Sequence, residues 1–245
     1  MSFLKKISVI IPTLQEEKVL IATLEQFTQA LRKDFSVEII VSDGGSTDRT
    51  VEIARKYADS VVEHTSASKQ NISQGRNRGA DAAQGGILIF LNADVMIEEP
   101  EKFFSTVLRV MENRAVSGVT CNVNIYPEEE RFFDWVFHNF YNGYFWLLNM
   151  TGLGMGRGEC HVVHSDVFRA MGGYNKDITA GEDFEFFLRL QKNGKIIFKR
   201  TLTVFESPRR FRKYGYLWVS LLWFLNAISV LFFRKSIMDQ WKPVR

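Results

Sequence analysis

The chain has 245 residues, of which 46% are hydrophobic and 24% charged, so it is globular material for one α/β domain or two small ones. Its formal net charge of +3 is mild and its basic residues cluster only late in the chain, which argues against nucleic acid as a partner. The two cysteines, Cys121 and Cys160, form no CxxC motif and no disulfide framework, so we expect a reducing, cytoplasmic compartment.

The first part of the chain alternates strands and helices. The opening apolar run is too short for a secretory signal, and ISVIIP (7–12) and VEIIVS (37–42) predict strands buried on both faces of a parallel sheet. A helical pattern from about Glu16 to Arg32 separates them and completes a βαβ unit. The next expected elements are a helix opened by a hydroxyl cap in STDRTVEIARKYA, a strand in SVVEH, a polar helix in SKQNISQGRNRGADAAQG and a strand in ILIFLNAD.

The second part keeps the alternation less cleanly. We expect a helix from Pro100 to about Asn113, a strand in AVSGVTCNVNI and a helix in the aromatic segment RFFDWVFHNFYNGYFWLLNM. GRGECHVVHSDVFRAMGGYN predicts a strand and a helix, AGEDFEFFLRLQKNGK an amphipathic helix closed by Gly194, and KIIFK a strand. The whole pattern predicts an α/β fold with a doubly wound, mostly parallel sheet and ligands at the carboxyl ends of its strands.

The last predicted element is an apolar helix. Residues 214–233 are about 20 residues without a charge, and basic residues stand on both sides of them. Such a helix could be buried, could form a protein interface or could enter a membrane, and its aromatic content and basic flanks favour a membrane. Because both flanks are basic, a helix lying in the plane of the cytoplasmic face is as much expected as one that crosses the bilayer.

Acidic and amide side chains collect where two predicted strands end. Asp43 and Asp48 follow one strand, and Asn92 and Asp94 follow another. Carboxylates at a site for a diphosphate need a divalent cation between them and the phosphates, and oxygen ligands suit Mg²⁺ or Mn²⁺. Taken alone, DGGSTD is better explained as a glycine turn followed by a capped helix than as a ligand site.

Four segments in order resemble the family 2 glycosyltransferases, which share the A-type nucleotide-sugar transferase fold. They are VIIPTLQEE, with a Pro-x-x-x-Glu turn, then VSDGGSTDRT, FLNAD at the place of an Asp-x-Asp motif, and AGEDFEF with a Glu-Asp pair. Together they span residues 7 to 185, and an ordered set is more specific than any one of its members. DGG in place of Asp-Asp-Gly is a variant of small bacterial enzymes of this family.

The resemblance implies which residues hold the nucleotide and the metal. Pro12 and Glu16 of the first turn would lie near the nucleoside, and Asp43, in the turn that includes Gly45, would contact its base. Asp94 would bind Mg²⁺ or Mn²⁺. In FLNAD an asparagine, at position 92, replaces the first acid of the motif, and its amide can coordinate or donate a hydrogen bond but brings no charge.

The Glu-Asp pair carries the proposed chemistry. By resemblance Asp183, beside Glu182, would take the proton of the acceptor hydroxyl in a single displacement that inverts the anomeric centre. Without the other landmarks, both acids would be assigned to the first turn of a helix, where the helix dipole favours them.

Three arginines could neutralise the leaving diphosphate. Arg76 in QGRNRGA is either a phosphate or nucleoside contact or part of a solvated helix face. Arg209 and Arg210 in SPRRFRK resemble an arginine-bearing stretch that closes over the diphosphate in related synthases, and a basic collar beside lipid would look the same. His161 and His164 are three apart on a strand, so their side chains point to opposite faces and no metal site is expected from them.

These observations predict an inverting hexosyltransferase that moves a sugar from a nucleotide-diphospho-sugar to a glycan or lipid-linked acceptor in cell-envelope synthesis. The catalytic domain is expected over residues 1–208, with a nucleotide-binding half at about 1–98 and an acceptor-side half at about 99–208, and a membrane-associating segment over 209–245. A nucleotide-sugar-binding module without turnover is one alternative, motivated by the asparagine at position 92. A nucleotidyltransferase is the other, although PTLQEE is not a glycine-rich, lysine-bearing phosphate loop.

Overall fold

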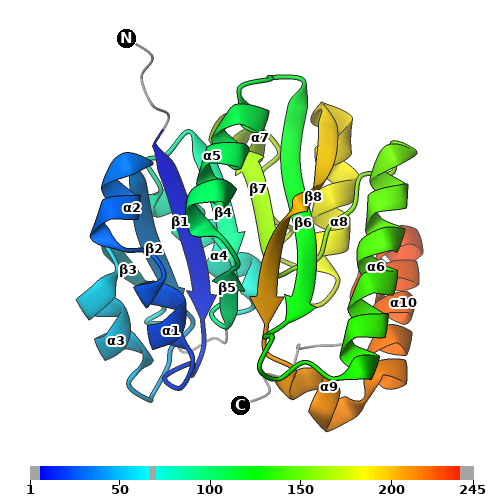
Figure 1. Cartoon of the computed structure of the whole chain (residues 1–245), viewed down its shortest axis with the longest axis horizontal. Coiled ribbons are helices and arrows are strands. Elements are labelled where there is room, and N and C mark those ends of the chain that lie inside the picture. The colour runs from blue at the N-terminus through cyan, green and yellow to red at the C-terminus, as the bar shows by residue number, and fades with distance from the viewer. Residues whose placement is uncertain (1–5, 67–69, 238–245) are drawn as a thin grey trace.

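A computed structural model of the chain describes residues 6–66 and 70–237 (Figure 1). The other residues, which include the first two positions of the expected polar helix at 68 and 69 and the end of the C-terminal segment, lie outside the described part. The described strands form one eight-stranded sheet in the order β3-β2-β1-β4-β7-β6-β8-β5. The strands are β1 (Ile7–Thr13), β2 (Val37–Asp43), β3 (Ser60–Glu63), β4 (Ile87–Leu91), β5 (Val95–Ile97), β6 (Val116–Ile125), β7 (Cys160–His164) and β8 (Lys195–Glu206).

The sheet is mostly parallel, as predicted. β1 pairs in parallel with β2 and β4, β2 with β3, and β6 with β8. β7 runs antiparallel to β4 and β6, and β5 runs antiparallel to β8. Because β1, β2 and β4 are parallel neighbours, their carboxyl ends share one edge, where Thr13 lies beside Asp43.

Helices cover both faces of the sheet and so complete the doubly wound arrangement. The helices α1 (Leu20–Glu25), α2 (Gln29–Asp34), α3 (Thr50–Tyr57) and α5 (Pro100–Met111) pack on one face. The helices α4 (Ile72–Ala82), α7 (Ser165–Ala170) and α8 (Glu182–Leu190), the last followed by the short turn η1 (Gln191–Asn193), pack on the other.

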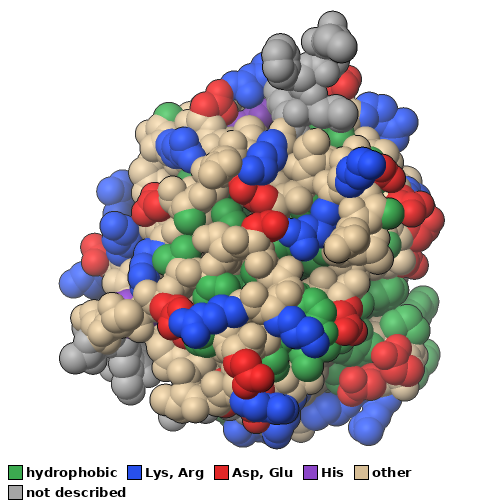
Figure 2. All heavy atoms as spheres, turned by 90° about the vertical axis from the view of Figure 1, so that its left-hand side faces the viewer, with side chains coloured by type: hydrophobic (Ala, Val, Ile, Leu, Met, Phe, Trp, Pro, Cys, Tyr) green, Lys and Arg blue, Asp and Glu red, His purple; other side chains and the backbone are tan. Residues whose placement is uncertain are grey.

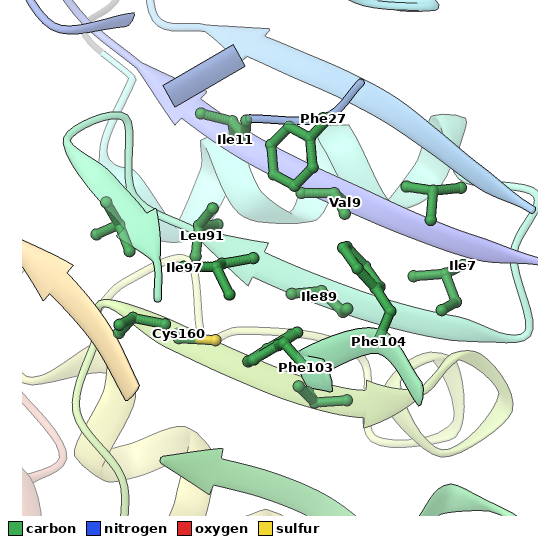
Figure 3. Close-up of a cluster of buried hydrophobic side chains, with 14 of the residues drawn as sticks. Ile7, Val9, Ile11, Phe27, Ile89, Leu91, Ile97, Phe103, Phe104 and Cys160 are labelled. Atoms are coloured by element: carbon green, nitrogen blue, oxygen red, sulfur yellow. The ribbon is translucent and has the colours of Figure 1, made fainter. Parts of the chain in front are cut away.

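Alternation along the strands supplies both cores. Ile7, Val9 and Ile11 of β1 point toward the face that Phe103 and Phe104 of α5 cover (Figure 3). The intervening residue Ile10 points to the opposite core, with α4 and α8. Each apolar position of the strand is thereby removed from water, which is why the run carries no polar alternation.

Three further helices lie at the end of the sheet away from β3. These are α6 (Phe132–Met150), α9 (Arg209–Tyr214) and α10 (Tyr216–Phe233), with α6 beside α10 (Figure 1). An aromatic cluster of Phe137, Phe211, Tyr216 and Trp223 joins them, with ring centroids 4.6 to 6.3 Å apart. By contrast, the face at the β3 side of the molecule is dominated by polar surface and by charged side chains of both signs (Figure 2).

Several details of the sequence prediction were wrong. The helix expected over 16–32 is two helices, because the Thr28 side chain caps α2 by accepting a hydrogen bond from the Leu31 amide. The hydroxyl cap expected for α3 is absent, since Asp48 accepts the Thr50 amide hydrogen bond. The last helix begins at Tyr216, after Gly215 at φ +78°.

The strands were also incompletely predicted. β5 was missed because it has three residues, too few for a period to show. KIIFK is the start of a longer strand, β8, which continues past an irregularity in its pairing with β6.

Candidate active site

A cavity of about 1030 Å³ opens at the edge where β1, β2 and β4 end. Residues 12–14, 44–45 and 92–94 form the wall on the sheet, and residues 155–159, the start of α8 and α9 form the other side. The cavity therefore lies where parallel strands were predicted to present their ligand. It is lined by every candidate site residue except Asp43, namely Pro12, Glu16, Gly45, Arg76, Asn92, Asp94, Glu182, Asp183, Arg209 and Arg210.

The turn after β2 is organised by Asp43 from inside. Its buried carboxylate accepts hydrogen bonds from the Thr13 hydroxyl at 3.0 Å, the Gly45 amide at 2.8 Å and both the amide and the hydroxyl of Ser46 at 2.7 and 2.5 Å. Gly45 adopts φ +96°, which a residue with a side chain rarely adopts. In this conformation the Asp43 carboxylate positions Gly44 and Gly45, which line the cavity, and its direct contact with a base stays a prediction.

Arg209 bridges two of the predicted ligand residues. Its Nη2 lies 3.0 Å from Oε2 of Glu16 and 3.1 Å from Oδ2 of Asp94. Burial raises the pKa of Asp94 above its usual value, and the nearby Arg209 opposes that shift without cancelling it. A carboxylate kept from water in this way gains from a second cation.

A divalent cation fits Asp94 as part of a site that a ligand completes. In the part of the chain that the structure describes, no three His, Cys, Asp or Glu side chains are grouped to hold a metal. Mg²⁺ and Mn²⁺ commonly bind through one or two carboxylates together with water and substrate phosphates. Asp94, alone at the cavity wall after β4, is suited to that form of coordination and not to an all-protein metal cage.

Arg76 is buried and holds three groups together. It donates to Oε1 of Glu182 at 2.8 Å, to Oδ1 of Asn92 at 3.1 Å and to the Gly158 carbonyl at 2.7 Å. Its guanidinium also lies 5.1 Å from the ring centroid of Tyr174. The solvated helix face considered for Arg76 is wrong, because the side chain is 1% exposed.

The Glu-Asp pair begins α8 at the cavity. Gly181 precedes it at φ +77°, a left-handed conformation that turns the chain into the helix. Burial, and then the adjacent charge of Glu182, raise the pKa of Asp183 from 3.8 to about 7. A carboxyl group with a pKa near neutrality can both accept and return a proton at physiological pH.

Sequence reasoning missed Arg157, Glu159 and Glu206, which line the cavity and which we call its acidic floor. Arg157 pairs with Glu206 at the end of β8, and its Nε lies 3.3 Å from Oε2 of Glu159. Burial raises the pKa of Glu206 well above its usual value despite that pairing. The repeated glycines of GLGMGRGE were a signal for this loop: a Cβ at Gly156 would lie 2.4 Å from Cζ of Phe187, so only glycine permits this approach.

Arg210 and the histidines are the remaining candidates. Arg210 lines the cavity beside Arg209, and burial lowers the pKa of its guanidinium. His161 contacts the Tyr174 hydroxyl at 2.5 Å within the core, and burial holds its pKa well below the usual value. It is a side chain of the core, 0% exposed.

The arrangement brings together cations and a poised carboxyl group in one cavity. Asp94, Arg209 and Arg210 can neutralise and orient a diphosphate, because a metal on a carboxylate and two guanidiniums complement its charge. Asp183 can remove a proton from a hydroxyl group that enters the same cavity. These are the parts that a transfer from a nucleoside diphosphate carrier to an alcohol requires.

Known proteins with similar sequences are named as glycosyltransferases. The sequence model described as "Glycosyl transferase family 2" matches residues 8–172. A "PGL/p-HBAD biosynthesis glycosyltransferase" of Mycobacterium tuberculosis is 28% identical over 210 residues, which are 83% of this chain and 77% of that protein. A "Cholesterol galactosyltransferase" of Borreliella burgdorferi is 36% identical over 122 residues, 48% of this chain and 32% of that protein.

The fold is likewise that of a known transferase structure. A mannosyltransferase from Pyrobaculum calidifontis, solved with GDP-Man and Mn²⁺, superimposes with a TM-score of 0.68 at 18% identity. The superposition covers 84% of this chain and 58% of that one, so this chain spans little more than half of the larger protein.

Proposed function

The chain belongs to glycosyl transferase family 2, and from this premise we propose that it transfers a hexose from a nucleotide-diphospho-sugar to an acceptor hydroxyl with inversion at the anomeric carbon. The observation that carries the proposal is Asp183, a carboxyl group with a pKa of about 7 in the cavity that also holds Asp94 and Arg209. A hexose agrees with the galactosyl and mannosyl names of two similar proteins.

Asp183 is the proposed general base. Its carboxylate accepts the proton of the acceptor hydroxyl while the oxygen forms a bond to the anomeric carbon. The bond from that carbon to the diphosphate oxygen breaks on the opposite face, and the electron pair leaves with the nucleoside diphosphate. One displacement of this kind inverts the anomeric centre.

The opposite side of the cavity holds the donor. Gly45 and Pro12 provide a backbone surface for the nucleoside, and Glu16 lies beside them at the cavity wall. Asp94 would hold Mg²⁺ or Mn²⁺, which supplies positive charge to the leaving diphosphate when bound. Arg209 and Arg210 supply further positive charge from α9.

Glu182, Arg76 and Asn92 position these groups. Glu182 raises the pKa of Asp183 and is held by Arg76, which also fixes the Asn92 amide. In this arrangement Asn92 engages the protein through its Oδ1, which leaves Asp94 as the metal ligand.

We assign the acceptor to the end of the cavity that Phe140, Tyr144 and Phe224 line, as a glycan or a lipid-linked alcohol at the cytoplasmic face of the cell membrane. One similar protein is named for cholesterol, an apolar alcohol. The described chain has one helix, α10, that is long and apolar enough to enter a membrane. In this proposal residues 1–98 bind the donor, 99–208 face the acceptor and 209–245 associate with the membrane.

The alternatives are less favoured. A nucleotidyltransferase and a binding module without turnover both lack support among the similar proteins, which are named as glycosyltransferases. The geometry also favours turnover, since a binding module has no need of a carboxyl group poised at neutrality.

Purified full-length protein with Mn²⁺, a panel of nucleotide sugars and a lipid extract tests the proposal. We expect release of a nucleoside diphosphate and a glycosylated product of inverted configuration. Asp183→Asn should lower the rate by roughly 10²–10⁴-fold and leave donor binding intact, because only the base is removed. The exposed Asp177→Asn is the matched control.

The fold of the Asp183→Asn variant can be checked independently. Folding raises the pKa of Asp183. Above the pKa that this carboxyl group has in the unfolded chain, such a group lowers the free energy of unfolding. The variant lacks this group, so it should be no less stable than wild type at pH 8. Equal transfer rates in the two proteins would refute Asp183 as the base, and nucleotide binding without any transfer would favour the binding module.

A further inference from the structure

α6 and α10 present large apolar side chains to the outside of the molecule. On α6, Phe133 is 74% and Phe140 66% exposed, and on α10, Leu217 is 89% and Phe224 62% exposed. The two helices lie beside each other and both contact the aromatic cluster around Trp223 (Figure 1). They form one surface, which we call the apolar face, and large apolar side chains gathered outward on two neighbouring helices are typical of an interaction site.

The charges around the apolar face are arranged at its margins. α10 contains no charged residue, and the one acid of α6, Asp134, is buried against Arg212. Exposed Lys213 precedes α10, and exposed Arg234 and Lys235 follow it. The margin before α6 is mixed in charge, because exposed Arg131 follows the exposed acids Glu128, Glu129 and Glu130. The uncharged helix α10, with basic side chains at both ends, complements a bilayer whose headgroups are anionic.

α10 is held along one side by the catalytic domain. Val219, Asn226 and Val230 are buried, and a Cβ at Gly181 would lie 3.5 Å from both Asn226 and Val230. Beyond the helix, the Ser236 hydroxyl bonds the backbone of residues 179 and 180, at 2.9 Å in each case. A helix attached to the domain along its length cannot cross a bilayer alone, so it can enter only with its free side, lying in the plane.

The active-site cavity reaches the apolar face. Phe140 and Tyr144 of α6 and Phe224 of α10 line the cavity, and these residues are 66%, 47% and 62% exposed. Trp223 lines the same stretch and lies 5.4 Å from the guanidinium of Arg157, at the acidic floor. The cavity is therefore apolar between the two helices and polar at Asp183.

We propose that α6 and α10 rest together in one leaflet of the membrane and that the hydrocarbon chain of a membrane lipid lies between them, with the hydroxyl of that lipid at Asp183. This inference rests on the proposed function for the identity of the reaction, and it adds the class of acceptor and its route. A polar headgroup alcohol carried on a hydrocarbon chain matches the change from apolar to polar along the cavity.

Photolabelling in vesicles tests the proposal with the full chain. Vesicles of equimolar phosphatidylcholine and phosphatidylglycerol carry a phospholipid with a diazirine on its acyl chain, and labelled residues are found by mass spectrometry. We expect the protein to sediment with the vesicles and to resist high salt, because apolar burial is not screened. We also expect labels at half-buried positions that line the cavity, such as Tyr141, Phe145 and Trp223.

Two substitutions on α10 separate the membrane contact from the lipid route. Phe224→Gln alters a residue of both the cavity and the apolar face, and Phe232→Gln alters a residue that is 72% exposed and does not line the cavity. Each should weaken vesicle binding by up to about tenfold. Only Phe224→Gln should reduce labelling inside the cavity among the molecules that remain bound.

The possible results bear on different parts of the proposal. No sedimentation with vesicles, or a dimer in solution that buries α6 and α10, would overturn the membrane contact. Sedimentation with labels confined to outer positions such as Leu217 and Phe232 would overturn the lipid route. Binding of nucleoside diphosphates, measured on the same samples, reports on the proposed function separately, because neither vesicle binding nor labelling requires turnover.

Discussion

The pH dependence of transfer should move when Glu182 loses its charge. Burial and Glu182 together raise the pKa of Asp183 by about 3 pH units, from 3.8 to about 7. The base is active when ionised, so kcat/KM for the donor, which reports on the free enzyme, should rise with pH through about 7 in the wild type. Glu182→Gln removes the adjacent negative charge and keeps the hydrogen-bonding shape of the side chain.

The change in the pKa of Asp183 on Glu182→Gln follows from Coulomb's law. At an effective dielectric constant of 20, any two unit charges roughly 6 Å apart repel by about 3 kcal/mol, which is about 2 pKa units. Arg76 pairs with Glu182 at 2.8 Å and offsets part of that repulsion. We therefore expect the acidic limb to move down by about 1 pH unit, while the larger effect, burial, stays in place.

At pH 6, ionised Asp183 would rise from about a tenth of the molecules to about a half. The assay is kcat/KM from pH 5 to 9, with each variant normalised to its own plateau. Glu185→Gln is the control, because Glu185 is also in the first turn of α8 but pairs with Arg189. An acidic limb that stays at the wild-type position in Glu182→Gln, or moves to higher pH, would refute the account of the pKa.

Four other substitutions give distinct results. Asp94→Ala should weaken metal-dependent donor binding by about tenfold or more, and Asn92→Ala by less, because only Asp94→Ala removes a negatively charged side chain from the proposed metal site. Calorimetry with and without Mn²⁺ measures the donor affinity. Equal and negligible losses of affinity in the two variants would place the metal elsewhere. Gly158→Ala puts a Cβ 3.2 Å from Oδ2 of Asp183 and should displace that carboxylate. We expect kcat to fall by about tenfold at unchanged donor affinity. An unchanged kcat would mean that transfer tolerates the displacement of Asp183. Ser236→Ala removes the hydroxyl that bonds the backbone before α8. It should lower the free energy of unfolding, measured by thermal unfolding, by about 1 kcal/mol and should slow transfer. A loss of stability with no change in the transfer rate would make that contact purely structural.

The sheet and its functional edge could be predicted from the sequence because both follow from short-range rules. Parallel strands that are buried on both faces have continuous apolar runs, and their carboxyl ends meet at one edge, which placed Pro12, Gly45, Asn92 and Asp94 around one cavity. Asp43 belongs to the same turn, but whether its carboxylate faces the ligand or the chain depends on four hydrogen bonds that no local pattern specifies.

The rest of the site depends on contacts between distant parts of the chain. Arg209 reaches Glu16 across 193 positions, and Arg76 reaches Glu182 across 106. Of the apolar face, the sequence predicts α10, which is an uncharged apolar run. It does not show which side of α6 faces outward, because aromatic residues occur on the packed and the free side of that helix alike. Amphipathic periodicity identifies a buried side only when the other side is polar.

The bridge from Arg209 to Glu16 and Asp94 has a kinetic consequence. Arg209 lies 3.1 Å from Asp94, the proposed metal ligand, and its positive charge would oppose the binding of a divalent cation alone. A diphosphate that bound together with the cation would give Arg209 another anionic partner, and the Asp94 carboxylate would then be open to the cation. Donor and cation should therefore bind as one unit, with weak affinity for either alone. After transfer, the return of Arg209 to the two acids competes with the departing nucleotide and hastens its release.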